Sequence, residues 1–60
     1  MQAHLIAKKN GLEAWITFDP SAEVFEIWAE PECECWIGCA DTRREAERIA
    51  RDWFAERACN

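Results

Sequence analysis

The chain has 60 residues, of which half are hydrophobic, with four Trp, four Cys and a formal net charge of −5 at pH 7. A chain this short folds as a single domain (1–60) that buries only about 60% of its unfolded surface. It seldom encloses the pocket of roughly 300 Å³ or more that a small-molecule enzyme uses. The acidic balance disfavours binding to a phosphate backbone, because proteins that do so carry a basic surface. We therefore expect a non-enzymatic domain without a cofactor.

The N-terminal segment does not have the pattern of a secretory signal, because Lys8 and Lys9 follow its short apolar stretch instead of preceding it. No apolar run approaches the ~18 residues that a membrane helix requires. The expected location is the cytoplasm (the host cytoplasm if a phage encodes the chain), where thiols are reduced.

Turn residues divide the first two thirds of the chain. Asn10-Gly11 lies between two apolar stretches and predicts a type I′ hairpin turn, because both residues tolerate positive φ. Asp19-Pro20-Ser21-Ala22 predicts a second turn, and Glu30-Pro31-Glu32 interrupts the chain again. The extended segments between these turns are 2–9, 12–19, 23–29 and a shorter fourth segment at 33–38.

The last third has a helical period. Thr42 and Glu45 fit a capping box, and the apolar residues that follow recur at spacings of three and four, which predicts a helix over 42–58. Those residues are Ala46, Ile49, Ala50, Trp53, Phe54 and Ala58. The predicted fold is α+β, an antiparallel meander of three or four strands with one C-terminal α-helix packed on one face.

Alternation along the strands separates two faces of the predicted sheet. Small and aliphatic side chains suit the helix, and strict alternation places Cys33, Cys35, Ile37 and Cys39 with them. The opposite face carries Trp15, Trp28 and Trp36, one for each strand. Cross-strand Trp pairs can simply shield a thin sheet, or they can anchor a partner at an interface.

Charge favours the second interpretation. Residues 13–41 contain eight acidic residues and no Lys or Arg, so this region would attract a basic partner. Enzyme activity is not expected, because no carboxylate lies in an apolar context that would suit it to acid catalysis. The predicted partner-binding residues are Trp15, Trp28, Trp36, Glu13, Asp19, Glu26, Glu30, Glu32 and Glu34.

Other chemistry-bearing residues have simpler interpretations. Cys33, Cys35 and Cys39 together with Cys59, or with His4 in its place, could supply four zinc ligands, but the Cys-x-Cys spacing is shorter than structural zinc sites use. A Cys39–Cys59 disulfide is a further alternative. His4 is expected at the surface. The helix could carry a basic stripe, although interleaved acids favour a solvated face; the stripe would comprise Arg43, Arg44, Arg48 and Arg51.

The segment Gly38-Cys39-Ala40-Asp41-Thr42-Arg43-Arg44-Glu45-Ala46 resembles the strand-to-helix junction of HicB-type antitoxins. That resemblance implies a basic toxin nuclease as partner. The segment is also similar to the arm-binding domain of tyrosine-type phage integrases, which implies DNA bound on the sheet. We do not expect direct nucleic-acid binding here, because the predicted sheet face would carry Glu26, Glu30 and Glu34.

In size, acidity and compactness the chain resembles the small phage-encoded inhibitors called anti-CRISPR proteins. This resemblance implies a carboxylate surface that occupies a basic channel meant for nucleic acid. The expected partner is then a basic nucleic-acid-binding protein or complex, for example a CRISPR effector subunit. A homodimer formed through the same face is an alternative.

Overall fold

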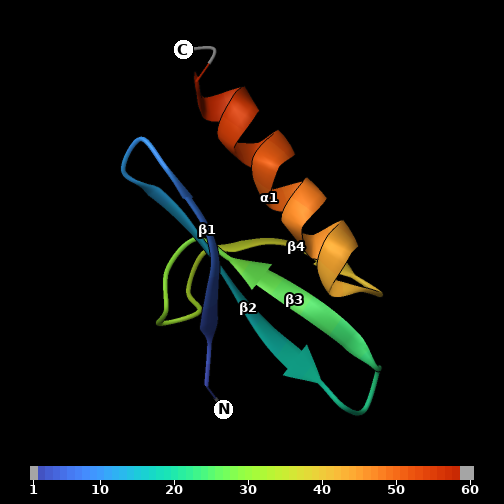
Figure 1. Cartoon of the computed structure of the whole chain (residues 1–60). Coiled ribbons are helices and arrows are strands. Elements are labelled where there is room, and N and C mark those ends of the chain that lie inside the picture. Colours follow the sequence, from blue (N-terminus) through green and yellow to red (C-terminus); the bar gives the residue numbers. More distant parts are fainter. Residues whose placement is uncertain (1, 59–60) are drawn as a thin grey trace.

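In the computed structural model, which describes residues 2–58, a four-stranded sheet precedes one helix (Figure 1). Each strand pairs antiparallel with the next, so the spatial order is β1-β2-β3-β4. This confirms the predicted α+β meander with all four strands formed. The element bounds are β1 (His4–Lys9), β2 (Leu12–Asp19), β3 (Val24–Trp28), β4 (Trp36–Ala40) and α1 (Arg43–Ala58).

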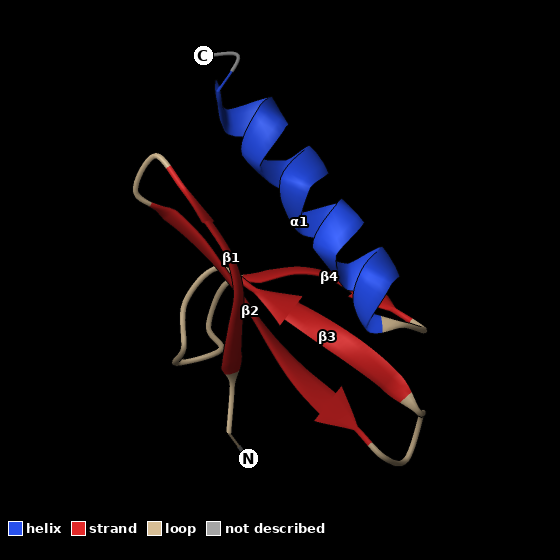
Figure 2. Ribbon diagram, viewed as in Figure 1, coloured by secondary structure: helices blue, strands red, loops and turns tan. Residues whose placement is uncertain are grey.

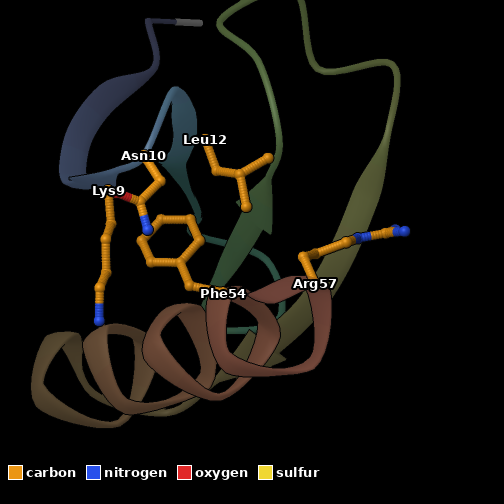
Figure 3. Close-up of a pocket in the computed structure, with 5 residues that line it drawn as sticks. All are labelled: Lys9, Asn10, Leu12, Phe54 and Arg57. Carbon is orange, nitrogen blue, oxygen red and sulfur yellow. The ribbon is translucent and has the colours of Figure 1, made fainter. Parts of the chain in front are cut away.

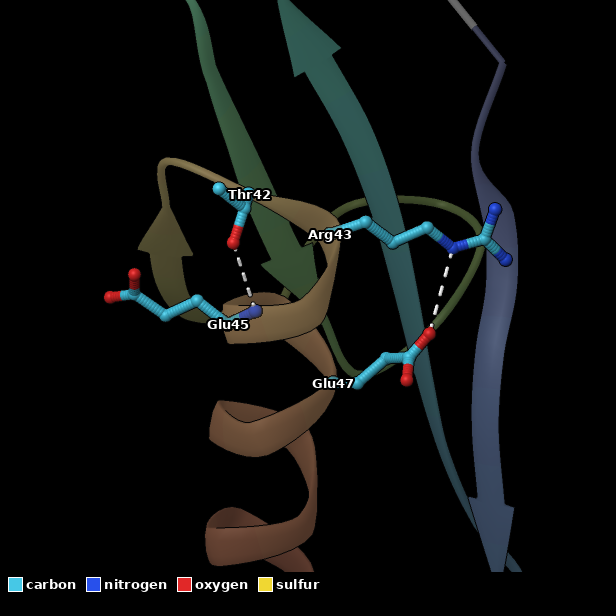
Figure 4. Close-up of polar contacts among 4 residues, drawn as sticks. All are labelled: Thr42, Arg43, Glu45 and Glu47. Carbon is cyan, nitrogen blue, oxygen red and sulfur yellow. Dashed lines mark hydrogen bonds and ion pairs between the residues drawn. The ribbon is translucent and has the colours of Figure 1, made fainter.

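The first turn and the start of the helix form where the local sequence predicts them. Asn10 and Gly11 have φ values of 53° and 83°, which a type I′ turn requires. At the start of α1, Thr42 Oγ1 accepts a hydrogen bond from the backbone N–H of Glu45 at 3.1 Å. The Glu45 side chain points away from Thr42 (Figure 4), so the reciprocal half of the capping box is not formed.

The helix packs along one face of the sheet (Figure 2). Alanines on both layers let the backbones approach closely, and Ile16, Ile27 and Phe54 fill the remaining core. Within the described residues, the helix is neither long enough nor apolar enough to cross a membrane. The buried cluster comprises Ala14, Ile16, Ile27, Ala40, Ala46, Ala50 and Phe54.

The predicted core-side placement of the cysteines is wrong for two reasons: the fourth strand begins at Trp36 and not at residue 33, which leaves Cys33 and Cys35 in the loop, and β4 contains an irregularity that turns Cys39 outward. Trp36 lies opposite Trp28, but the register then shifts by one residue, so that Cys39 lies opposite Glu26 on the face away from the helix. Ala40 takes the buried position instead. Cys35 precedes β4 and is exposed, whereas Cys33 is partly buried in the loop before it.

Candidate functional site: the open face of the sheet

One row of large apolar side chains crosses all four strands. Leu5 lies opposite Trp15, Trp15 opposite Trp28, and Trp28 opposite Trp36. Directly opposed residues project from the same side of a sheet. The neighbouring β2 residues, Ala14 and Ile16, belong to the core beneath α1, so this row projects from the other face. We call these four residues the aromatic row and the face that carries them the open face.

The indoles of the aromatic row have different roles. Trp15 Nε1 donates to Glu13 Oε1 at 2.9 Å, and Trp28 Nε1 donates to Thr17 Oγ1 at 3.1 Å. Thr17 projects from the open face yet is only 5% exposed, which fits a side chain that the Trp28 indole covers. Trp36 is 56% exposed. Trp15 and Trp28 therefore help to shield the sheet, whereas Trp36 offers most of its surface to solvent.

Sequence reasoning missed Leu5, which is 44% exposed at the other end of the row. The pairing of β1 with β2 shifts between Leu5 and Ala7, so one residue is inserted at Ile6. A bulge of this kind moves every residue beyond it to the opposite face. Alternation counted from Lys8 would have placed Leu5 beneath the helix, and no feature of the sequence marks the insertion.

The predicted acidic residues are not equivalent. Glu13 and Glu26 lie on the open face, in the rows on either side of the aromatic row. Asp19 is four residues beyond Trp15, or about 13 Å along the strand. Its carboxylate accepts a hydrogen bond from the N–H of Ser21 at 3.0 Å, so Asp19 closes its own turn and does not border the row.

The loop between β3 and β4 holds the remaining acids. Glu30 Oε1 accepts hydrogen bonds from the backbone N–H groups of Glu34 and Cys35, the latter at 2.8 Å. The carboxylate of Glu30 therefore organises this loop. Glu32 and Glu34 are exposed, and the loop extends on the side of β1 away from α1 (Figure 1). The loop connects Trp28 on β3 to Trp36 on β4, so it joins the two strands that carry these members of the aromatic row.

The fourth tryptophan lies apart from the open face. Trp53 on α1 packs against the core, and the Arg57 guanidinium lies 5.0 Å from its ring centroid, within cation–π range. Near the same end of the helix, the β1–β2 hairpin overhangs a shallow recess of about 260 Å³ above Phe54 (Figure 3). Lys9, Asn10 and Leu12 line the recess from the hairpin, and none of the predicted site residues does so.

Metal-ligating side chains do not converge in the described part of the chain. Among residues 2–58, no group of three or more His, Cys, Asp and Glu is placed to hold an ion. His4 is exposed on β1. Cys59, which the disulfide alternative needs and which is one of the two candidates for the fourth zinc ligand, lies outside the described residues.

Comparisons with known proteins do not connect the chain to a family. No family model matches the sequence, and neither curated proteins nor solved structures give a significant match. Function must therefore be argued from the geometry of the open face.

Proposed function

We propose that the protein is a non-enzymatic inhibitor whose open face occupies a basic nucleic-acid-binding groove of a partner protein. A phage-encoded inhibitor of the anti-CRISPR kind, acting in the host cytoplasm on a CRISPR effector subunit, is the most concrete form of this proposal. The observation that carries it is the aromatic row, which spans the sheet on the face without a helix and has carboxylates beside it.

The apolar part of this face has the composition of an interface centre. Trp is among the residues that contribute most to binding when a partner buries it within a ring of polar groups. Trp36 is the most exposed member of the aromatic row, and Leu5 adds apolar surface at the opposite sheet edge. The indole N–H groups of Trp15 and Trp28 already have acceptors, so burying those rings leaves no donor unsatisfied.

The charged part of the face selects a basic partner. The chain contains no Lys or Arg between residues 13 and 41, and the strand residues of the open face include one cation, Lys8, which lies opposite Glu13. Exposed carboxylates at Glu32 and Glu34 raise the encounter rate with a Lys- and Arg-lined groove. A nucleic acid would be repelled by the same groups, which makes competition for the groove the natural mode of action.

Affinity capture with matched baits tests the proposal. Wild-type protein, a Trp36→Ala variant and a Phe18→Ala variant are each used to capture proteins from the native host cell, with nuclease present. Phe18 is the control because it is an exposed aromatic residue (46%) on the other face. It is two residues from Ile16 on β2, so its side chain projects from the helix side of the sheet. The expected result is a basic nucleic-acid-binding protein that wild type and Phe18→Ala retain and Trp36→Ala loses.

Competition with nucleic acid and a charge-reversal variant test the mode of action. The captured protein should release this chain when its own nucleic acid is added in excess, and Glu32→Lys/Glu34→Lys should weaken its binding at least tenfold, or ~1.4 kcal/mol. Equal capture by Trp36→Ala and wild type would rule out the open face as the docking surface. Binding of nucleic acid by the isolated chain would instead favour a nucleic-acid-binding module.

A further inference from the structure

The outer face of α1 carries a row of arginines that the proposed function does not use. Arg44, Arg48 and Arg51 are exposed and line one hollow at the surface, together with Thr42 and Glu45. Spacings of four and three residues place the arginines side by side on the helix. We call these three residues the arginine row.

The arginine row forms no ion pair with residues 2–58. In the described part of the chain, Arg43 pairs with Glu47, at 3.7 Å between Nε and Oε2 (Figure 4), and no ion pair involves the arginine row. Like charges at these spacings destabilise a helix by a few tenths of a kcal/mol. Glu45 is the one acidic residue that lines the same hollow, so positive charge exceeds negative charge there by two.

Uncompensated negative charge lies on the opposite side of the molecule. Glu32 and Glu34 are exposed on the β3–β4 loop, which extends away from α1 (Figure 1). The sheet separates this loop from the outer face of the helix, so the two surfaces cannot meet within one chain. A second copy can bring them together.

We infer that the arginine row binds the acidic β3–β4 loop of a second copy, so that the protein associates with itself head to tail. The charges argue against the symmetric alternative, because a dimer formed open face to open face would bring the carboxylates of two identical faces, Glu13 and Glu26 among them, toward each other. A head-to-tail contact uses two different surfaces and leaves one of each unoccupied at its ends. Self-association should therefore extend as concentration rises and stay weak, because the contact is small and exposed to solvent.

Charge reversal with complementation tests this inference. Weight-average mass is measured by sedimentation at about 1 mM protein, a concentration at which weak contacts are populated. Arg44→Glu/Arg48→Glu should reduce the association constant at least tenfold, and so should Glu32→Arg/Glu34→Arg. An equimolar mixture of the two variants should associate again with 1:1 stoichiometry, because the acidic loop of one meets the arginine row of the other and the two reversed surfaces also have opposite charge.

Two controls separate this contact from a general effect of charge. Lys8→Glu/Lys9→Glu lowers the net charge by the same amount as Arg44→Glu/Arg48→Glu, but at the distant hairpin, and should leave association unchanged. Association should also weaken from about 10 mM to 0.15 M salt, because the Debye length falls from about 30 Å to about 8 Å. The helix should tolerate glutamate at 44, since acidic residues suit its first turn.

Several outcomes would overturn the inference. Wild-type protein that stays monomeric at low salt would do so, and so would a mixture of the two variants that does not associate. Association that disappears with nuclease treatment would also do so, because it would mean that a nucleic acid bridges the arginine rows.

The inference and the proposed function can fail separately. Arg44→Glu/Arg48→Glu leaves the open face intact, so capture of a partner by this variant tests the proposed function alone.

Discussion

The two tryptophans at the centre and at the edge of the sheet illustrate how residues of one type acquire different roles. Trp28 has strands on both sides, donates to Thr17 and shields that side chain from solvent. Trp36 occupies an edge strand and remains mostly exposed. Alternation along the strands places both residues on one face. It does not show which indole packs over a neighbouring side chain and which stays exposed to solvent.

This difference predicts unequal effects on stability. Trp28→Ala should lower the free energy of unfolding by about 2 kcal/mol, because it removes buried apolar area and a hydrogen bond. Trp36→Ala should lower it by less than about 1 kcal/mol, since much of its ring is already in water. Urea denaturation of the two variants measures both values, and equal losses would contradict the roles assigned here.

Glu30 provides a second prediction at the scale of single residues. Glu30→Ala removes the acceptor of two backbone N–H groups in the β3–β4 loop. It should lower the free energy of unfolding by about 1 kcal/mol. Amide hydrogen exchange at Glu34 and Cys35 should accelerate in this variant. Glu32→Ala, in the same loop but with an exposed side chain, should leave both rates unchanged, and acceleration in both variants would argue against a specific role for Glu30.

At the scale of elements, the sequence predicts structure well where a local signal determines it. Asn10-Gly11 specifies a turn, and Thr42 with the apolar period after it specifies the start and the buried face of α1. The register shifts at Ile6 and near Ile37 have no such signal, because a bulge depends on how two distant strands fit together. These two shifts place Leu5 and Cys39 on the open face, where strict alternation would not place them.

The start of the helix offers a test at this scale. Thr42→Ala should lower the free energy of unfolding by about 1 kcal/mol, because the N–H of Glu45 loses its side-chain acceptor. Thr42→Ser keeps the hydroxyl and should retain most of the stability. Thermal unfolding followed by circular dichroism compares the two variants, and an equal loss in both would show that the methyl group of Thr42 matters more than its hydroxyl.

At the scale of the whole molecule, the fold separates charge between two sides. The helix covers one face of the sheet and presents arginines outward, whereas the other face presents indoles with carboxylates around them. Alternation predicted the three-tryptophan face, and the turn residues at 19–22 predicted the local hydrogen bond of Asp19, but the contribution of Leu5 and the internal hydrogen bonds of Glu30 required the folded chain. The central claim is that the open face, not the helix, contacts the partner.

The four indole N–H groups report on this claim within a single experiment, because three lie on the open face and Trp53 lies on the helix. Magnetisation is transferred from the captured partner to isotope-labelled protein, and the intensity loss at each indole N–H is recorded. We expect the largest loss at Trp36, smaller losses at Trp15 and Trp28, and none at Trp53. The largest loss at Trp53, with Trp36 unaffected, would contradict this claim.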